Sequence, residues 1–375
     1  MKDLFNINLS DSQATSVQPL SIDKFDIEKF TSYENTLSER CRNFAAAGSG
    51  VLVYRRMRVK EVFAEDCGDM KKSLEWQLGA LEKSLLFKAD IPNFLEPWYG
   101  LGTVASAFGM DYVWEKGQAP AVKGKYASTL ELLQANCVPV AETAIGKHTL
   151  QMTEYFMEKT KGLLPMSYCD IQSPLNTLSN VIESNQFYMD FYMDPESMTL
   201  ALDNCADLLI DFTKIQLSII GDALAKPGHG FASSRWFEGI GMSDDSVTML
   251  PSDLYFDMVA PAMIKAGNYF GGTGFHSCGN WSDKKEGIAR IQNIRVADGA
   301  FSLATDPGAN ATDGFADAFV NTGVVLNARI VGNTSLITEK VKALWKPGMK
   351  LIVVTYCETP EEQAEVYDII HGICQ

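Results

Sequence analysis

The stretch GGTGFHSCGN, residues 271–280, has the pattern of a short buried strand that ends in reactive side chains. Small residues lead into the apolar part, and His276 and Cys278 follow it two positions apart. A second run of this kind, LIVVTY at residues 351–356, is followed directly by Cys357. Short apolar runs bounded by glycine and polar residues are typical of the buried strands of a parallel sheet.

Six further segments share this pattern, and helical periodicity fills most of the intervals between them. The eight predicted strands are residues 50–54, 91–96, 163–169, 230–240, 271–276, 299–304, 324–329 and 351–356. Strands that alternate with helices predict a parallel sheet, and eight such units predict an α/β fold closed into a (β/α)8 TIM barrel. An open doubly wound sheet is the alternative, but no Gly-x-Gly-x-x-Gly fingerprint follows an early strand.

The amino-terminal part differs from the repeating units. Residues 1–26 are polar, and a helical pattern follows until about residue 47, where Gly48 and Gly50 end it. We therefore expect an N-terminal arm and helix over residues 1–49, and one barrel domain over residues 50–375.

The composition limits the class of protein and its partners. Of 375 residues, 46% are hydrophobic and 21% are charged, which is ample for a large core. The net charge of −15 argues against nucleic acid or an anionic membrane as a partner, because both require basic surfaces. No apolar run reaches membrane-spanning length, and the first residues lack the apolar core of a signal peptide. We expect a cytoplasmic protein whose eight cysteines are reduced.

In a barrel of this kind, functional side chains lie where strands end and the following loops begin. His276 and Cys278 can project to the same side of one strand end, and imidazole with thiolate is a donor set suited to zinc. A hydrogen-bonded core histidine beside a small buried thiol would give the same pattern, so this spacing alone leaves both interpretations open. Cys357, at the end of the last strand, would supply a third ligand and leave one position for substrate.

Two aspartates are further candidates for the chemistry. Asp170 and Asp244 each follow a predicted strand, so we predict proton transfer for either and metal ligation for Asp244. Capping of the next segment is the alternative role for such residues. The predicted substrate-binding residues at the same edge are Trp98, Tyr99, Trp236, Asp245, Asp306 and Arg329.

The order of these motifs resembles the uroporphyrinogen decarboxylase superfamily, and within it the zinc-containing cobamide methyltransferases. It rests on the strand that ends in His276-Ser277-Cys278-Gly279 and on the later strand that ends in Cys357. The segments that agree with it are WYGLG at 98–102, AFG at 107–109, SPLN at 173–176 and SDDS at 243–246. The resemblance covers about residues 50–375. It implies a TIM barrel in which His276, Cys278 and Cys357 bind zinc, with Asp244 at a position where glutamate is usual.

The activity implied by this resemblance is methyl transfer between a corrinoid (cobalamin), carried by a partner protein, and a thiol or another small donor or acceptor. Zinc would lower the pKa of the thiol, so that a thiolate exists at neutral pH. The decarboxylase branch, which acts on a carboxylated tetrapyrrole of the porphyrin pathway without a metal, is the alternative. Arginines 55, 56 and 58 lack the glycine and tyrosine neighbours of that branch's arginine-rich loop. A non-catalytic corrinoid-binding barrel is a third hypothesis, and pairing of two barrels into a homodimer stays open.

Overall fold

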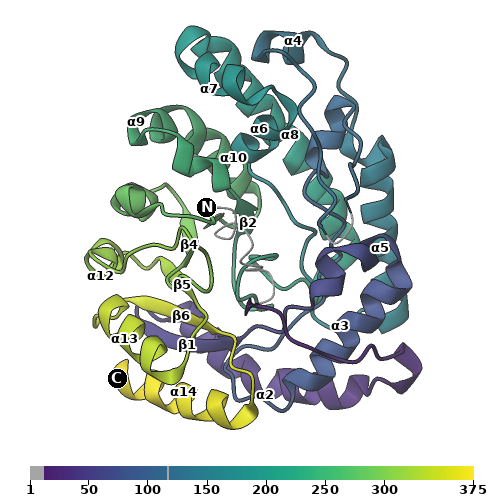
Figure 1. Ribbon diagram of the computed structural model, residues 1–375. Coiled ribbons are helices and arrows are strands. Elements are labelled where there is room, and N and C mark those ends of the chain that lie inside the picture. The colour runs from purple at the N-terminus through teal and green to yellow at the C-terminus, as the bar shows by residue number, and fades with distance from the viewer. Residues whose placement is uncertain (1–11, 116–117) are drawn as a thin grey trace, which may run out of the picture.

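In the computed structural model, which describes residues 12–115 and 118–375, the chain forms an α/β fold with helices around a parallel sheet (Figure 1). The sheet has six strands in the order β1-β6-β5-β4-β3-β2, and every neighbouring pair is parallel. The strands are β1 (Gly50–Arg55), β2 (Ile240–Ser243), β3 (Thr273–His276), β4 (Ile294–Ala300), β5 (Val325–Ile330) and β6 (Lys350–Thr355). The predicted α/β class is confirmed.

Helices fill the connections between these strands. The α-helices are α2 (Ile27–Ala46), α3 (Met70–Ser84), α4 (Thr129–Gln134), α5 (Ala144–Thr160), α6 (Pro174–Val181), α7 (Ser184–Met193), α8 (Pro195–Ile220), α9 (Ser252–Leu254), α10 (Ala260–Tyr269), α11 (Lys285–Ile288), α12 (Phe315–Phe319), α13 (Thr334–Leu344) and α14 (Pro360–Ile373). A π-helical turn, Tyr255–Val259, joins α9 to α10. Short 3-10 helices span Ile22–Lys24, Lys60–Phe63, Glu65–Gly68, Val104–Phe108, Val140–Glu142, Gly221–Ala223, Asp245–Met249 and Ser282–Lys284.

Local sequence signals explain where the longest helix begins. Asp194 caps α8 by accepting a hydrogen bond from the amide of Ser197, and Pro195 occupies the first helical position. That position needs no amide hydrogen, because the first turn of a helix leaves its N–H groups unpaired. Thr359 and Pro360 start α14 in the same way. Within the described residues, no helix is long and apolar enough to cross a membrane.

Four predicted strands differ from the structure. The strand predicted at 299–304 is β4, which begins five residues earlier and ends at Ala300, because Arg295 and Asp298 interrupt its apolar run. Residues 91–96 and 163–169 form no regular strand, because Pro92 and Pro165 carry no amide hydrogen for a ladder. They are joined instead by isolated parallel bridges, from Leu95 to Met166 and from Met166 to Leu224. The prediction for residues 230–240 was wrong: the segment is a loop, and β2 begins only at residue 240.

Alternate residues of the strands face two different cores. On β6, Ile352 and Val354 pack with Leu52 and Tyr54 of β1, and residue 356 continues the same side. Leu351, Val353 and Cys357 belong to the larger core beneath the helices. Because side chains of a strand alternate between its faces, positions 356 and 357 point in opposite directions.

Asp90 ties the amino-terminal helix to the end of the chain. Its buried carboxylate accepts hydrogen bonds from the hydroxyl of Tyr367 at 2.6 Å and from the amide of Val53 at 2.8 Å. The same carboxylate pairs with Arg40 of α2 and lies 2.8 Å from Nε2 of His371 on α14. Burial raises the pKa of Asp90, but His371 and Tyr367 outweigh burial and hold it below its ordinary value.

Candidate metal centre

Three of the predicted site residues come together where β2 and β3 end. His276 is the last residue of β3, Cys278 lies two positions further, and Asp245 opens the 3-10 helix after β2. Their ligand atoms lie within 4.8 Å of one another. In residues 12–115 and 118–375, this is the one group of histidine, cysteine and acidic side chains with such spacing.

The distances inside this group suit a tetrahedral zinc ion. The Sγ of Cys278 lies 3.8 Å from Nε2 of His276, and the amide of Cys278 donates to Oδ1 of Asp245 at 2.5 Å. Tetrahedral bonds of about 2.0–2.1 Å to nitrogen and about 2.3 Å to sulfur place the two atoms ~3.5 Å apart. Imidazole, thiolate and carboxylate are also the three donor types that zinc accepts in proteins.

A buried carboxylate contacts the ring nitrogen of His276 that points away from Cys278. Its Nδ1 lies 2.7 Å from Oδ2 of Asp298, on the neighbouring strand β4. Asp298 is fully buried, pairs with Nε of Arg329 at 2.8 Å, and accepts a hydrogen bond from Asn327 on β5. A carboxylate on the far nitrogen fixes the orientation of a ligating histidine, so Nε2 is left to face Cys278 and Asp245.

The same contacts set the protonation of this histidine. Burial on its own lowers the pKa of His276, but the carboxylate of Asp298 outweighs burial and raises it to about 10. Burial raises the pKa of Asp298, yet Arg329 and His276 hold it below its ordinary value. A metal bound at Nε2 therefore has to displace a proton from the ring.

The structure does not bring Cys357 to this group. Cys357 packs beneath the helices, and burial raises the pKa of its thiol to about 12. Its carbonyl accepts a hydrogen bond from Nε of Arg55 at 2.8 Å. The structure thus places Asp245, and not the predicted Cys357, beside His276 and Cys278.

Asp244 supports the end of β2 instead of facing the metal group. One carboxylate oxygen accepts from Ser173, and the other accepts from the hydroxyl of Tyr255 at 2.6 Å. Burial raises its pKa to about 6. Its partners occupy both oxygens, and its neighbour Asp245, not Asp244, lies in the group with His276 and Cys278.

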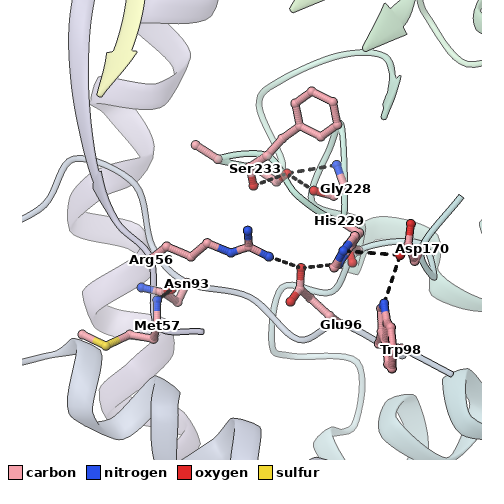
Figure 2. A network of polar contacts seen from close by, with 12 residues as sticks. Arg56, Met57, Asn93, Glu96, Trp98, Asp170, Gly228, His229 and Ser233 are labelled. Atoms are coloured by element: carbon pink, nitrogen blue, oxygen red, sulfur yellow. Dashed lines mark hydrogen bonds and ion pairs between the residues drawn. The ribbon is translucent and has the colours of Figure 1, made fainter. Parts of the chain in front are cut away.

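A chain of polar contacts is centred on His229 (Figure 2). His229 lies between two carboxylates, with Nδ1 3.2 Å from Oε1 of Glu96 and Nε2 3.5 Å from Oδ2 of Asp170. Arg56 lies 3.7 Å from Glu96, and the indole of Trp98 donates to Asp170 at 3.1 Å. Asp170 and Trp98, both predicted, are therefore in one cluster with Arg56 and with two residues that the sequence analysis did not single out, Glu96 and His229.

Gly230 brings the backbone next to His229 close to the ring of His276. Gly230, next to His229, adopts a φ of +85°, and a Cβ at this position would lie 3.3 Å from Nδ1 of His276. Burial raises the pKa of Glu96, but His229 and Arg56 outweigh burial and lower it. The glycines at 228 and 230 were the one sequence signal that marked His229, since they indicate a tight approach of the backbone.

The remaining predicted residues divide between the two ends of the sheet. Asp306 accepts from the amides of Gly279 and Gly308, so it shapes the loop after Cys278. Arg329 is the buried partner of Asp298 described above. Tyr99 stacks on His148 with ring centres 3.8 Å apart.

Trp236 lies at the opposite end, near the first residues of β5 and β6, with the guanidinium of Arg42 4.0 Å from its ring centre. Its predicted place in the site was wrong, because residues 230–240 are not a strand.

Comparison with known proteins gives a likeness of fold. No family model and no curated protein sequence matches the chain. Among solved structures, the chain is similar to a methyltransferase from Methanosarcina mazei, with a TM-score of 0.51 and 15% identity, over 79% of this chain and 83% of that one. Methylaspartate ammonia lyase from Clostridium tetanomorphum gives a TM-score of 0.31 and 8% identity, over 90% of this chain and 71% of that one. The similarity to the methyltransferase concerns the fold alone. The TM-score to the ammonia lyase is too low to support any inference.

Proposed function

We propose that this chain is a zinc-dependent methyltransferase on a (β/α)8 barrel of the uroporphyrinogen decarboxylase type. It would move a methyl group between a corrinoid, carried by a partner protein, and a small thiol or another donor or acceptor. The observation that carries this proposal is the donor group of Asp245, His276 and Cys278 at the carboxyl ends of two parallel strands. The likeness in fold to the Methanosarcina mazei methyltransferase supports it.

The bridges outside the regular strands support the barrel. The amide of Asp90 donates to the carbonyl of Val53 on β1 at 2.8 Å, and Leu95 pairs with Met166. Further along that segment, Gln172 pairs with Ser243 of β2. Segments 90–95 and 165–172 thus contact the two edge strands of the sheet, and they would be the two remaining strands of the proposed eight-stranded barrel.

Each residue of the donor group has a part in holding the metal. Nε2 of His276, Sγ of Cys278 and the carboxylate of Asp245 would bind zinc, and three protein ligands leave a fourth position for a substrate thiol. Zinc supplies Lewis acidity that favours the thiolate over the thiol. Asp298 and Arg329 keep the imidazole in place while the substrate exchanges.

The thiol has to lose a proton before its sulfur can attack a methyl group, and His229 is placed to accept it. Its side chain is 17% exposed, and the carboxylates of Glu96 and Asp170 on either side stabilise the imidazolium that forms. Arg56 and Trp98 hold these two carboxylates in position. In this proposal His229 receives the proton that leaves the substrate sulfur, and the two carboxylates beside it balance the added charge.

One observation favours the decarboxylase alternative. Arg56 and Asp170, an arginine and an acid that such a reaction would use on a carboxylated substrate, lie in the same cluster. This alternative predicts turnover that chelators do not affect and that Arg56→Gln abolishes. A non-catalytic barrel would bind corrinoid without methyl transfer to any thiol.

The test combines metal analysis with demethylation of methylcobalamin by a panel of small thiols. We expect about one zinc per chain and thiol-dependent demethylation, both lost in Cys278→Ser. Cys137→Ser is the matched control, since this cysteine is exposed and lies outside the donor group. Wild-type protein that takes up no zinc would refute the proposal, and turnover in the presence of a chelator would favour decarboxylation.

A further inference from the structure

A second cavity lies at the end of the sheet opposite to the metal group. It has a volume of about 500 Å³, within the range of sites for small ligands. Val325 and Lys350, the first residues of β5 and β6, form its floor, and the end of α2 and the loop with Trp236 form its walls. The metal group lies where the strands end, so the two sites are separated by the length of the sheet.

The charges around this cavity are mostly positive. Arg42, Arg295 and Lys350 line it, and Glu238 is the one acidic residue among the described residues of the lining. Glu238 pairs with Arg295 at 3.2 Å, while Arg42 lies over the face of Trp236. Two positive charges therefore remain without a carboxylate from the lining, in a chain whose net charge is −15.

Lys350 is the buried member of this set. The residue is 7% exposed, and Nζ donates to the carbonyl of Ala45 at 3.1 Å and lies 4.8 Å from the ring centre of Phe44. None of the ion pairs among residues 12–115 and 118–375 involves Lys350. Burial lowers the pKa of this amine, and the nearby Arg295 lowers it further. A buried ammonium with a single neutral acceptor is unfavourable, and an anion in the cavity would remove that penalty.

We infer that this cavity binds a small organic anion, in which a phosphate or carboxylate is attached to an apolar group. Lys350 and Arg42 provide the positive charge for the anionic group. Trp236, Phe237 and the alanines at 45–47 provide apolar walls for the rest of the molecule. A cavity of about 500 Å³ is far larger than inorganic phosphate, so the apolar part fills the remaining space. Nothing in this inference depends on the metal or on methyl transfer.

Isothermal titration calorimetry on the full chain as purified tests it with four probes. AMP carries a phosphate on a planar base, benzoate carries a carboxylate on a ring, inorganic phosphate has the charge alone, and adenosine has the base alone. We expect AMP, benzoate or both to bind at one site with a Kd below about 1 mM, and phosphate and adenosine to bind about 10-fold more weakly. The preference between AMP and benzoate identifies the anionic group.

Matched variants locate the binding. Lys350→Met removes the buried charge, and Lys342→Met removes an exposed charge from α13 outside the cavity. We expect a loss of about 10-fold or more in the first, because a charge-assisted hydrogen bond is lost, and no change in the second. Arg42→Gln, at an exposed position, covers the case in which Lys350→Met does not fold. Absence of saturable binding of both organic anions, or equal weakening by Lys350→Met and Lys342→Met, would overturn the inference.

Discussion

Replacing Asp245 by asparagine and Cys357 by serine separates two arrangements of the metal centre. Asparagine keeps the side-chain oxygen that accepts the 2.5 Å hydrogen bond from the amide of Cys278, so the loop keeps its shape and the ligand charge is lost. Loss of a residue that only supports a ligand costs about 10–100-fold in metal affinity. We therefore expect Asp245→Asn, which removes a ligand itself, to weaken zinc binding at least about 100-fold.

Cys357→Ser should leave the zinc affinity within about 2-fold of wild type, because this thiol lies 4% exposed on the helix-facing side of its strand. Its effect should be on stability, at about 1 kcal/mol, since a hydroxyl replaces a buried thiol. Zinc content after dialysis and competition with a chromophoric chelator measure the affinity, and thermal unfolding measures the stability. If zinc is lost in Cys357→Ser and kept in Asp245→Asn, Asp245 is not the third ligand. That result would favour the ligand set of His276, Cys278 and Cys357.

Three further substitutions test other parts of the structure. Asp298→Asn leaves all ligands in place and should weaken zinc binding about 10–100-fold in the same competition assay, because the ring of His276 loses its carboxylate; an unchanged affinity would contradict the supporting role. His229→Gln should reduce methyl transfer about 100-fold with unchanged zinc content and should alter the pH profile, and a normal rate would exclude it as the proton acceptor. Asp90→Asn should lower the free energy of unfolding by about 2 kcal/mol at pH 7, because the buried acceptor of the hydrogen bonds from Tyr367 and Val53 loses its charge. The folded-state pKa of Asp90 is lowered, so its contribution is complete above about pH 4 and is lost as the pH falls through the folded-state value; urea titrations should show this decline in wild type and not in the variant.

Three strands of the second half of the chain were predictable because their boundaries are local. Glycines and polar residues flank β3, β5 and β6, and the predicted limits agree with the structure within two residues. The two early segments fail this test, since each holds a proline and pairs through isolated bridges only. For residues 230–240, aromatic and apolar residues suggested a strand, but Gly230 and Gly239 at positive φ turn the chain instead.

The site was predictable in part for the same reason. The spacing of His276 and Cys278 is a local property of one strand end, and the structure brings both side chains together. Which residue lies third in the group depends on the face of the strand end that it occupies. A shift of one position along the chain moves a side chain to the opposite face, so Asp245 lies in the group where Asp244 was predicted. In the same way, Tyr356 and not Cys357 lies on the inner side of the last strand. Contacts such as His276 with Asp298, or His229 with Glu96, join segments whose register no local pattern specifies.

The two soft ligands of the proposed centre differ in how firmly the fold holds them. His276 is the end of a strand and is fixed by Asp298, whereas Cys278 is exposed on the loop that follows. A solvent-accessible thiolate is open to oxidants, and oxidation to the sulfenic or sulfinic acid would remove the sulfur ligand. The imidazole would remain in place under the same conditions. Bound zinc would therefore act as a protecting group for Cys278, and metal loss and oxidative inactivation would occur together.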